Sequence, residues 1–323
     1  MNNEFDFITR NFLPLAKNTE SMHLMNDAAY IKNKNLVISS DMMIENVHFK
    51  KNDSPYNIAR KLLRVNLSDL SSMGSEPYGY ILNLAIPKTK NNSWVSMFCE
   101  GLKIEQKQFN LKLFGGDISF SKSIFLSITI FGKNKMKPHN LNSAKENSDI
   151  FVSGYIGDAA LGFFLENTNK IREYLDPEDL DYFKDSFWMP KPRINLGQNL
   201  NGFANSCTDI SDGLLSDLNK IAFHSKLMAE IDITKIPLSN KSKKVKSLFS
   251  NTKKFWEIVL SGGEDYELIF SMNKQKQKVF FNDQRLNKNK ITKIGSFKKG
   301  KGVFVFDNKN KRILYKKMGF CHF

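Results

Sequence analysis

The hydrophobic pattern of residues 54–74 predicts a helix with one acidic position on its buried side. The residues of this side follow one another at steps of 4, 3, 4 and 4: Ile58, Leu62, Val65, Asp69 and Met73. These steps trace one face of a helix with 3.6 residues per turn. Four of the five residues are apolar, and Asp69 places a carboxylate where a core residue is expected.

An inward-facing carboxylate needs a partner, because an isolated buried charge is too costly to keep. Asp69 is therefore expected to face a cation or several hydrogen-bond donors. The structural alternative is that Asp69 caps a helix or forms an ion pair with Arg60 or Arg64. Other acidic stretches of the chain bear on this choice.

Segments with strand-like and helix-like patterns alternate along both halves of the chain. Strands are predicted at residues 29–31, 36–41, 78–87, 111–117, 123–131, 150–155, 228–233, 256–260, 266–271 and 302–306. Helices are predicted at residues 4–17, 54–74, 93–109, 157–166, within 167–206, and directly after Gly213. Alternation of this kind indicates an α/β (α+β) protein. The polar stretch 132–147 is expected to link an N-terminal domain, 1–138, to a C-terminal domain, 149–323.

The composition is that of a protein with a substantial core. The chain has 323 residues, of which 41% are hydrophobic and 27 are Phe, and this length suits one large domain or two ordinary ones. The longest apolar run, 123–131, is only strand-sized, and the N-terminus lacks the pattern of a secretory signal. Three scattered cysteines without metal-ligand spacing favour a reduced, cytoplasmic protein.

The net charge of 48 − 33 = +15 raises the alternative of a nucleic-acid-binding protein. The lysines, however, occur mostly in Asn/Lys-rich turns spread along the chain, so we interpret them as solvated loop residues. A basic field of this kind also helps to attract phosphorylated substrates. Nucleic-acid binding would instead predict strongly salt-dependent association with DNA or RNA.

Six aspartates share one local context, a strand or helix end with small or hydroxyl-bearing neighbours. They are Asp27, Asp41, Asp69, Asp117, Asp209 and Asp212. Carboxylates and hydroxyls are hard oxygen ligands of the kind that Mg²⁺ prefers, together with water and substrate phosphates. Each aspartate alone is better explained as a turn or cap residue, whereas the shared context of all six favours a common site. The sequence does not show that the six meet in space.

Glycines lie beside several of these candidates. Gly115 and Gly116 allow the backbone to approach a ligand closely just before Asp117. Ser211 opens a helix, where free amide groups favour phosphate. Glu264 follows two glycines in another turn, and its structural alternative is a solvated turn carboxylate.

One near-match to a phosphate-binding loop is interpreted differently. Residues 295–302 nearly fit a Walker-type motif, but Gly302 replaces the final Ser or Thr. The segment that follows has a strand pattern, whereas the motif needs a helix there. We therefore interpret residues 295–302 as a Lys-rich hairpin turn.

Taken together, these motifs resemble the thiamine-monophosphate kinase family of the PurM-like (aminoimidazole ribonucleotide synthetase-like) superfamily nearly from end to end. The motifs that carry the resemblance are Asn26-Asp-Ala-Ala29, Ser39-Ser-Asp41, Val47-His-Phe49, Val65-Asn-Leu-Ser-Asp-Leu70, Gly115-Gly-Asp117, Gly154–Ala160, Asp209-Ile-Ser-Asp-Gly-Leu-Leu215, Ser261-Gly-Gly-Glu-Asp-Tyr-Glu-Leu268 and Gly319-Phe-Cys-His-Phe323.

The resemblance implies a PurM-like two-domain fold whose N-terminal sheet domain dimerises. It implies transfer of the γ-phosphoryl group of ATP to thiamine phosphate, with several Mg²⁺ ions and Asp69, Asp117 and Asp209 as catalytic residues. The implied metal ligands are Asp27, Ser39, Ser40, Asp41, Asp69, Asp117, Asp209 and Asp212. The implied ATP contacts are Gly116, Asp117 and Ser211, and the implied thiamine phosphate contacts are His48, Glu264 and Phe320.

Two positions depart from the family pattern, and other members of the superfamily remain alternatives. Asn26 stands where an acidic residue is usual, and Asn142 stands where an Arg that reaches ATP is usual. A degenerate, inactive relative is therefore one alternative. Aminoimidazole ribonucleotide synthetase is another, as is selenophosphate synthetase, although no cysteine lies in the Gly-rich N-terminal segment that the latter needs.

Overall fold

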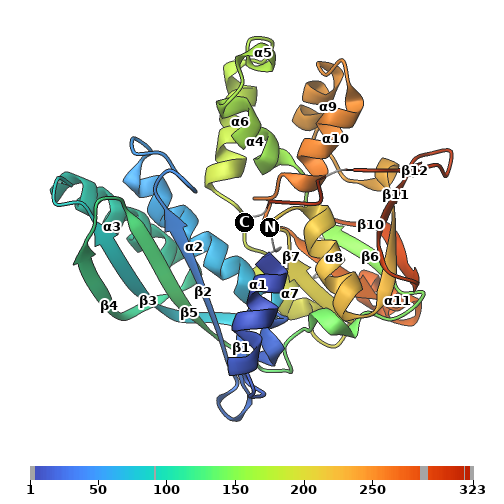
Figure 1. The fold of residues 1–323 in the computed structure, drawn as a ribbon, viewed down its shortest axis with the longest axis horizontal. Helices are drawn as coiled ribbons and strands as arrows, with labels where there is room; N and C mark the ends of the chain where they lie inside the picture. Colours follow the sequence, from blue (N-terminus) through green and yellow to red (C-terminus); the bar gives the residue numbers. More distant parts are fainter. Residues whose placement is uncertain (1–3, 91, 284–289, 316, 321–323) are drawn as a thin grey trace.

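The protein contains two mixed α/β domains, each built on its own sheet, as the sequence predicts (Figure 1). The structure is a computed structural model that describes residues 4–90, 92–283, 290–315 and 317–320. A short N-terminal segment, with α1 (Glu4–Asn11), η1 (Leu13–Leu15) and η2 (Met22–Leu24), precedes the first sheet. The predicted helix at 4–17 is therefore a helix followed by a single 3₁₀ turn.

The described residues form an N-terminal sheet of five strands in the order β1-β2-β5-β3-β4. Their bounds are β1 (Ala29–Ile31), β2 (Leu36–Ile44), β3 (Glu76–Ile86), β4 (Lys112–Phe120) and β5 (Phe125–Lys133), with η3 (Lys32–Lys34) between the first two. β4 runs parallel to β3 and forms one edge of the sheet. The other pairings are antiparallel.

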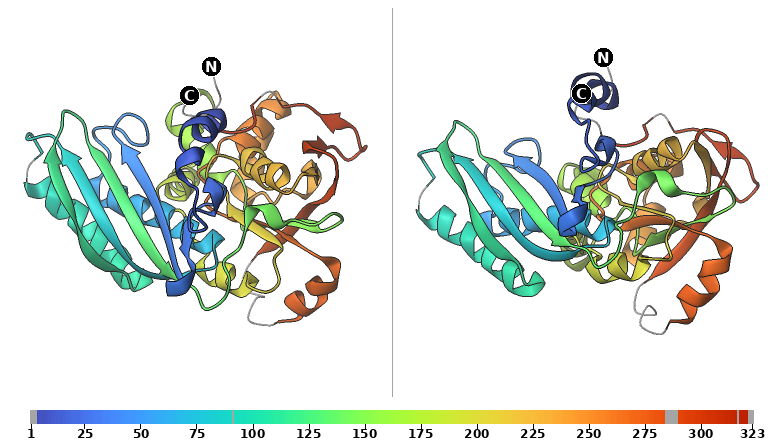
Figure 2. Two further views of the ribbon diagram at one scale, coloured as in Figure 1. Left: turned by 60° about the horizontal axis from the view of Figure 1, so that its bottom comes forward. Right: turned by 90° about the horizontal axis from the view of Figure 1, so that it is seen from below.

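Helices α2 (Pro55–Ser72) and α3 (Asn92–Phe109) lie together on one side of this sheet (Figure 2). The face of α2 that the sequence predicts is buried, since Ile58, Leu62 and Val65 are at most 4% exposed. The opposite side of the sheet stays open in the isolated chain, where Met42 and Phe125 are 57% and 43% exposed.

The C-terminal sheet has seven described strands in the order β12-β11-β8-β10-β6-β9-β7. Their bounds are β6 (Asp149–Ser153), β7 (Ser206–Asp209), β8 (Leu227–Asp232), β9 (Leu268–Met272), β10 (Ile291–Lys299), β11 (Gly302–Phe306) and β12 (Arg312–Ile313). The helices are α4 (Asp158–Glu166), α5 (Asn169–Arg172), α6 (Pro177–Trp188), α7 (Ile194–Leu200), α8 (Leu214–His224), α9 (Asn240–Ser247), α10 (Thr252–Ser261) and α11 (Lys274–Asn282), with η4 (Leu141–Ser143) and η5 (Ile233–Lys235).

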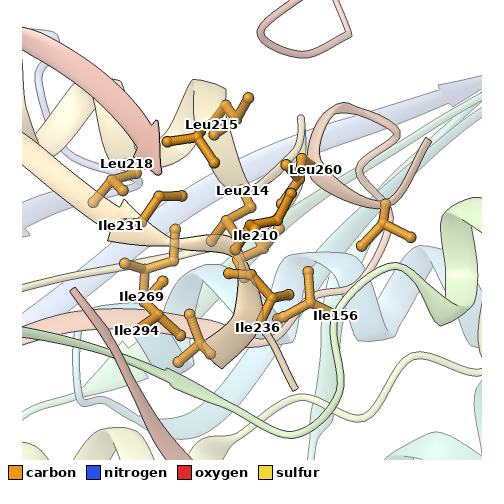
Figure 3. Close-up of a cluster of buried hydrophobic side chains, with 14 of the residues drawn as sticks. Ile156, Ile210, Leu214, Leu215, Leu218, Ile231, Ile236, Leu260, Ile269 and Ile294 are labelled. Carbon is orange, nitrogen blue, oxygen red and sulfur yellow. The ribbon is translucent and has the colours of Figure 1, made fainter. Parts of the chain in front are cut away.

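Apolar side chains cover both faces of the C-terminal sheet. Ile150 and Val152 of β6 face a core shared with α4, α8 and α10, whereas Phe151 faces a second cluster shared with α7 and α11. This alternation follows from the two-residue period of a strand. The first core also contains Ile210, Leu214 and Leu260 (Figure 3). These residues flank two loops that the sequence selected as functional, so the core fixes the ends of both loops.

Two predictions for the C-terminal half are wrong. Residues 256–260 belong to the helix α10 rather than to a strand, and the buried residues Phe255, Trp256, Val259 and Leu260 recur with helical spacing. The segment 295–302 does lead into a strand, as predicted, but β10 and β11 do not form a hairpin. Both strands pair with β8, which lies between them.

Helix α2 also forms much of the contact between the two domains. It packs against α7, β7 and α6 of the C-terminal domain. Gly197 of α7 approaches so closely that an added Cβ would lie 1.9 Å from the carbonyl oxygen of Ser71. No helix in the described part of the chain is long and apolar enough to cross a membrane.

Candidate active site

A cavity of about 590 Å³ opens between the two domains. Strand β2, the turn after it and α2 contribute to its N-terminal wall, and two loops, helices α4 and α6 and residue 320 contribute to its C-terminal wall. Eight residues that the sequence selected line it: Ser40, Asp41, His48, Asp69, Ser211, Asp212, Glu264 and Phe320. Motifs that are far apart in the sequence therefore meet in this cavity.

The acidic part of the cavity lining is formed by carboxylates that repel one another. Burial raises the pKa of Asp41 to about 6, with a further contribution from the nearby carboxylate of Asp27. Burial also holds the pKa of Asp69 well above its ordinary value, and Asp41 and Asp209 add to this effect. Such shifts are typical of a site that is completed by positive charge.

Asp69 has no arginine partner, contrary to the structural alternative for this residue. Its carboxylate accepts a hydrogen bond of 2.5 Å from the hydroxyl of Ser39 on β2. Arg60 and Arg64 instead bind the fully buried carboxylate of Glu105 on α3, at 2.6 and 2.9 Å. Asp69 also lies inside α2 rather than at its end, so it is not a cap.

Asp27 and Asp209 lie beside this cavity and are held by hydroxyl groups across the domain boundary. The carboxylate of Asp27 accepts hydrogen bonds from Thr208 Oγ1 at 3.0 Å. The carboxylate of Asp209 accepts one from Ser68 Oγ of α2 at 2.5 Å. Burial raises the pKa of both aspartates. These bonds fix the acidic residues of one domain relative to those of the other.

The donor set of the acidic part fits a divalent cation that prefers oxygen ligands. Within residues 4–90, 92–283, 290–315 and 317–320, no three His, Cys, Asp or Glu side chains form a group that could hold a metal by themselves. Carboxylate and hydroxyl oxygens are the ligands that Mg²⁺ prefers, and this ion is usually held by one or two carboxylates together with water and substrate phosphates.

Asp217, which the sequence analysis did not select, organises the loop before α8. Its Oδ2 accepts hydrogen bonds of 3.1 Å from the N–H groups of Ser211, Asp212 and Gly213. The ammonium group of Lys220 lies 2.8 Å from Oδ1 of Asp217 and 2.8 Å from Oδ2 of Asp212. Asp212 therefore already faces a cation, in contrast to Asp69.

Backbone hydrogen bonds join the loop before α8 to the two other C-terminal motifs. Three bonds of 2.8–2.9 Å do so: Glu264 N–H to Ser211 O, Tyr266 N–H to Ile210 O, and Phe320 N–H to Asp212 O. The three motifs thus form one unit although they are separated by up to 110 residues in the sequence.

The turn that carries Glu264 has an uncommon backbone conformation. Gly263 has a φ of 71° and Glu264 a φ of 68°, a region that is sparsely populated by residues other than glycine. A Cβ on Gly263 would lie 2.3 Å from the carbonyl oxygen of Ser211. Glycine is therefore needed at position 263 for the two loops to approach.

The part of the cavity lining that α4, α6 and Phe320 contribute is aromatic. Phe163, Phe187, His48 and Phe320 contribute rings to the lining, and the rings of Phe163 and Phe187 lie 5.6 Å apart. His48 is oriented by the backbone, because its Nδ1 accepts a hydrogen bond of 3.0 Å from Ile44 N–H. This part of the lining fits a planar aromatic group.

Gly116 and Asp117 are not brought to the cavity. Both are exposed residues of the edge strand β4, and the Asp117 N–H donates to Asn83 Oδ1 at 3.1 Å. The strand registers align Asp117 with Met42 of β2, across β3 and β5. Three strand spacings of about 4.8 Å separate them by roughly 14 Å.

The two departures from the family pattern have different surroundings. Asn26 donates to Asn140 Oδ1 and accepts from the Leu141 N–H, both at 2.9 Å. An aspartate could not donate the first of these bonds, so the amide suits a role in holding the segment between the domains. Asn142 is exposed in η4 and does not line the cavity.

Lys61 is the functional candidate that the sequence analysis missed. It lines the cavity and forms an ion pair with Glu264. The pattern contained a signal for it, since Ile58, Lys61, Val65 and Asp69 follow one another at steps of 3, 4 and 4. A lysine at an inward-facing helical position is a candidate for a functional role on the same grounds as Asp69.

Comparisons with known proteins agree on one family. Residues 25–134 match AIR synthase related protein, N-terminal domain, and residues 147–308 match AIR synthase related protein, C-terminal domain. The chain is 34% identical to the thiamine-monophosphate kinase of Buchnera aphidicola from Acyrthosiphon pisum, with 99% of this chain and 98% of the relative covered. It is 36% identical to that of Haemophilus influenzae, with 83% and 81% covered.

Solved structures give the same result for the fold. AaThiL complexed with AMPPCP and TMP superposes with a TM-score of 0.84 at 28% identity, covering 99% of this chain and 97% of that one. Thiamine monophosphate kinase from Aquifex aeolicus gives a TM-score of 0.82 at 28% identity, with 97% and 98% covered. The hydrogenase maturation protein HypE, at 14% identity and a TM-score of 0.69, shares the fold.

Proposed function

The chain belongs to the thiamine-monophosphate kinase family, and from this premise we propose that it transfers the γ-phosphoryl group of ATP to thiamine phosphate, giving thiamine diphosphate and ADP. The single observation that carries the proposal is the cavity between the two domains, whose lining combines carboxylates with aromatic rings. A relative with both AMPPCP, an ATP analogue, and TMP bound superposes over nearly the whole chain. ATP is thus the co-substrate.

The aromatic part of the cavity lining suits the thiamine part of the acceptor. His48, Phe320 and Glu264 are the residues assigned to it here. Rings can stack on the planar heteroaromatic groups, and the carboxylate can accept a hydrogen bond from an amino substituent. The phosphate of the acceptor would then point toward the acidic part of the lining.

Mg²⁺ is proposed as the resident cation of the acidic part of the lining. Several Mg²⁺ ions are proposed, shared among Asp27, Ser39, Ser40, Asp41, Asp69, Asp209 and Asp212 of one copy and Asp117 of a second copy. When bound, Mg²⁺ neutralises the negative charge that accumulates as two phosphate groups approach.

The chain itself contributes positioning more than acid–base chemistry. The acceptor oxygen of thiamine phosphate is already anionic, so no strong general base is needed to activate it. The prediction of free amide groups before α8 is wrong, because the N–H groups of Ser211, Asp212 and Gly213 are bound to Asp217. We therefore assign the hydroxyl group of Ser211, a residue that lines the cavity, to the nucleotide phosphates. We therefore propose direct in-line transfer, without a covalent enzyme intermediate.

A homodimer is proposed as the functional assembly. All nine residues of β4 are exposed in the isolated chain, and its large apolar side chains Leu113, Phe114, Ile118 and Phe120 are 47–72% exposed. An unpaired edge with such side chains is normally covered. We assign a second copy of the chain as the cover. A neighbouring copy would then bring its Gly116 and Asp117 to the nucleotide.

Two further assignments complete the proposal. Residues 1–138 and 149–323 are taken as the two domains, with the two sheets spanning Ala29–Lys133 and Asp149–Ile313. A cytoplasmic location is proposed from the cysteines. Cys99 and Cys207 are free thiols, whereas Cys321, with the last residues of the terminal motif, lies outside the described residues.

The test is an assay of the purified chain with MgATP and thiamine phosphate, with separation of the products by chromatography. Equal amounts of thiamine diphosphate and ADP are expected. ADP without thiamine diphosphate would point to another acceptor within the superfamily. ATP binding without turnover would favour a degenerate relative.

A further inference from the structure

Lys61 is a buried cation in the wall of the cavity that no predicted role explains. It lies on α2 in the N-terminal domain, and the residue is only 2% exposed. Its Nζ is 2.6 Å from Oε2 of Glu264, which belongs to the C-terminal domain. The pair therefore joins the two walls of the cavity.

The surroundings of the ammonium group suit a structural cation rather than a group that meets the ligand itself. Nζ lies 3.3 Å from the ring centroid of Phe187 and 5.5 Å from that of Trp188. Nζ has less than 1 Å² of exposed surface, and its ion-pair partner among the described residues is Glu264. Burial lowers the pKa of Lys61, and the carboxylate of Glu264 opposes this shift.

Glu264 is held from two directions. Its backbone N–H is bound to Ser211 O at 2.8 Å in a turn with positive φ, and its buried Oε2 faces Lys61. The side chain is nevertheless 28% exposed and lines the cavity. With Oε2 directed at the lysine, the rest of the carboxylate is left to face a ligand.

We propose that Lys61 is a positioning residue that orients Glu264 so that its free oxygen accepts a hydrogen bond from the amino group on the pyrimidine ring of the acceptor. This inference rests on the proposed function, and it explains how the site would select its acceptor substrate. A carboxylate fixed in this way selects a ring with an N–H donor and disfavours one with an oxygen at the same position. Lys61 acts through Glu264 and does not touch the reacting phosphates.

The first test compares Lys61→Met with the unmodified chain. The KM for thiamine phosphate is expected to rise about tenfold to hundredfold, because an oriented hydrogen bond to a charged group is lost. The KM for ATP should change by no more than about twofold. Isothermal titration with thiamine phosphate in the absence of ATP should give the same loss of affinity.

The second test uses oxythiamine phosphate, in which oxygen replaces the pyrimidine amino group. The unmodified chain should prefer thiamine phosphate, and Lys61→Met should lose most of this preference. In Glu264→Gln, Lys61 should hold the amide oxygen and turn the NH₂ group toward the ring. The preference should then shift toward oxythiamine phosphate, whereas the double variant Lys61→Met with Glu264→Gln should show little preference.

Lys241→Met is the matched control. Lys241 pairs with Asp179 at 2.7 Å and lies 5.8 Å from the ring centroid of Tyr182, away from the cavity. This variant should keep the kinetic constants and the preference of the unmodified chain. The double variant Lys61→Met with Glu264→Gln leaves no unpaired charge from this ion pair. If Lys61→Met alone folds poorly, comparing the double variant with Glu264→Gln still tests the effect of Lys61 on the preference.

The outcomes separate this inference from the proposed function. If the unmodified chain does not phosphorylate thiamine phosphate, the proposed function fails, and the inference fails with it. If the unmodified chain is active but Lys61→Met keeps its KM and its preference, only the inference is overturned. Equal increases in both KM values would likewise overturn it, since they indicate a general structural role.

Discussion

At the scale of single residues, the candidate site depends on acidic side chains at positions where apolar ones are usual. Asp69 occupies a core-facing position of α2 and is surrounded by other carboxylates rather than by arginines. Keeping it ionised costs free energy in the empty protein. A residue that is unfavourable for the fold and lies in a cavity is a candidate for function.

Replacing Asp69 by Asn should separate these two effects. Turnover should fall by about 100-fold or more, because a charge that opposes the reacting phosphates is lost. The melting temperature should stay the same or rise, because a repelling buried charge is removed. Asp181→Asn, at an exposed position of α6, is the control for both measurements. A variant with near-normal activity would remove Asp69 from the site.

The stability of the metal-free protein should depend on pH through Asp41. Burial raises the pKa of this group to about 6 in the folded state, whereas an unfolded aspartate has a pKa near 4. Between these pH values the folded protein holds a proton that the unfolded chain has lost, so the free energy of unfolding falls as pH rises.

Denaturant unfolding in EDTA between about pH 4 and pH 7 measures this decrease. Asp41→Asn should make it smaller, and added Mg²⁺ should restore stability at pH 7 more than at pH 4. An identical pH profile in the Asn variant would show that Asp41 titrates normally.

At the scale of elements, the site depends on how closely the C-terminal loops approach one another. The loop before α8 and the turn that carries Glu264 are bound together through backbone groups. Their ends are fixed by core residues such as Ile210 and Leu260 (Figure 3). A substitution that separates the loops should therefore disturb the site without touching any functional side chain.

Gly263→Ala provides such a substitution. The new Cβ would lie 2.3 Å from the carbonyl oxygen of Ser211, and the alanine would have to adopt a positive φ. The free energy of unfolding should therefore fall by about 1–3 kcal/mol. The KM for thiamine phosphate should rise. Gly202→Ala is the matched control, because φ is also positive there but the nearest atom is 3.6 Å away. Equal effects of the two variants in denaturant unfolding and kinetics would show that loop contact is unimportant.

Elements with a clear hydrophobic period were predictable from the sequence. Short apolar runs without a clear period, and strand pairings between distant segments, were not. The period of α2 predicted its bounds to within two residues at either end. The apolar run at 256–260 is equally compatible with a strand when it is taken alone. Its helical spacing becomes evident only when Phe255 is included. The pairing of β10 and β11 with β8 could not be predicted from turn residues, since the paired residues of β8 lie 64 to 74 positions earlier in the chain.

At the scale of the whole molecule, the motifs predicted a set of site residues, and the fold of one copy brings only some of them together. Asp41, Asp69 and Asp212 meet as the resemblance implied. Asp117 shares their sequence style, yet its strand lies at the far edge of the sheet. Sequence patterns report local context, whereas the order of strands is set by long-range pairing.

Ile118→Lys should test the proposed role of this edge. Ile118 is 70% exposed in the isolated chain, so the change should hardly affect the fold of one copy but should oppose burial of β4 against another. Light scattering should report a mass near 37 kDa instead of twice that value, and turnover should fall. Val279→Lys, at a residue that is 64% exposed on α11, is the control. A dimeric, active Ile118→Lys protein would place β4 outside the interface.

The strand order of the C-terminal sheet also dictates when that domain can form during synthesis. Each pairing among its seven described strands includes β9, β10, β11 or β12. No ladder in the sheet can therefore close before residue 268 has left the ribosome, although β6 begins at residue 149. At about 5–20 residues per second, the apolar strand β6 waits on the order of 10 s for a partner. The N-terminal sheet is complete at residue 133. A nascent chain should therefore carry a folded N-terminal domain and a C-terminal segment whose strands have no partners yet. A cell that makes this enzyme should rely on chaperones to protect that second half.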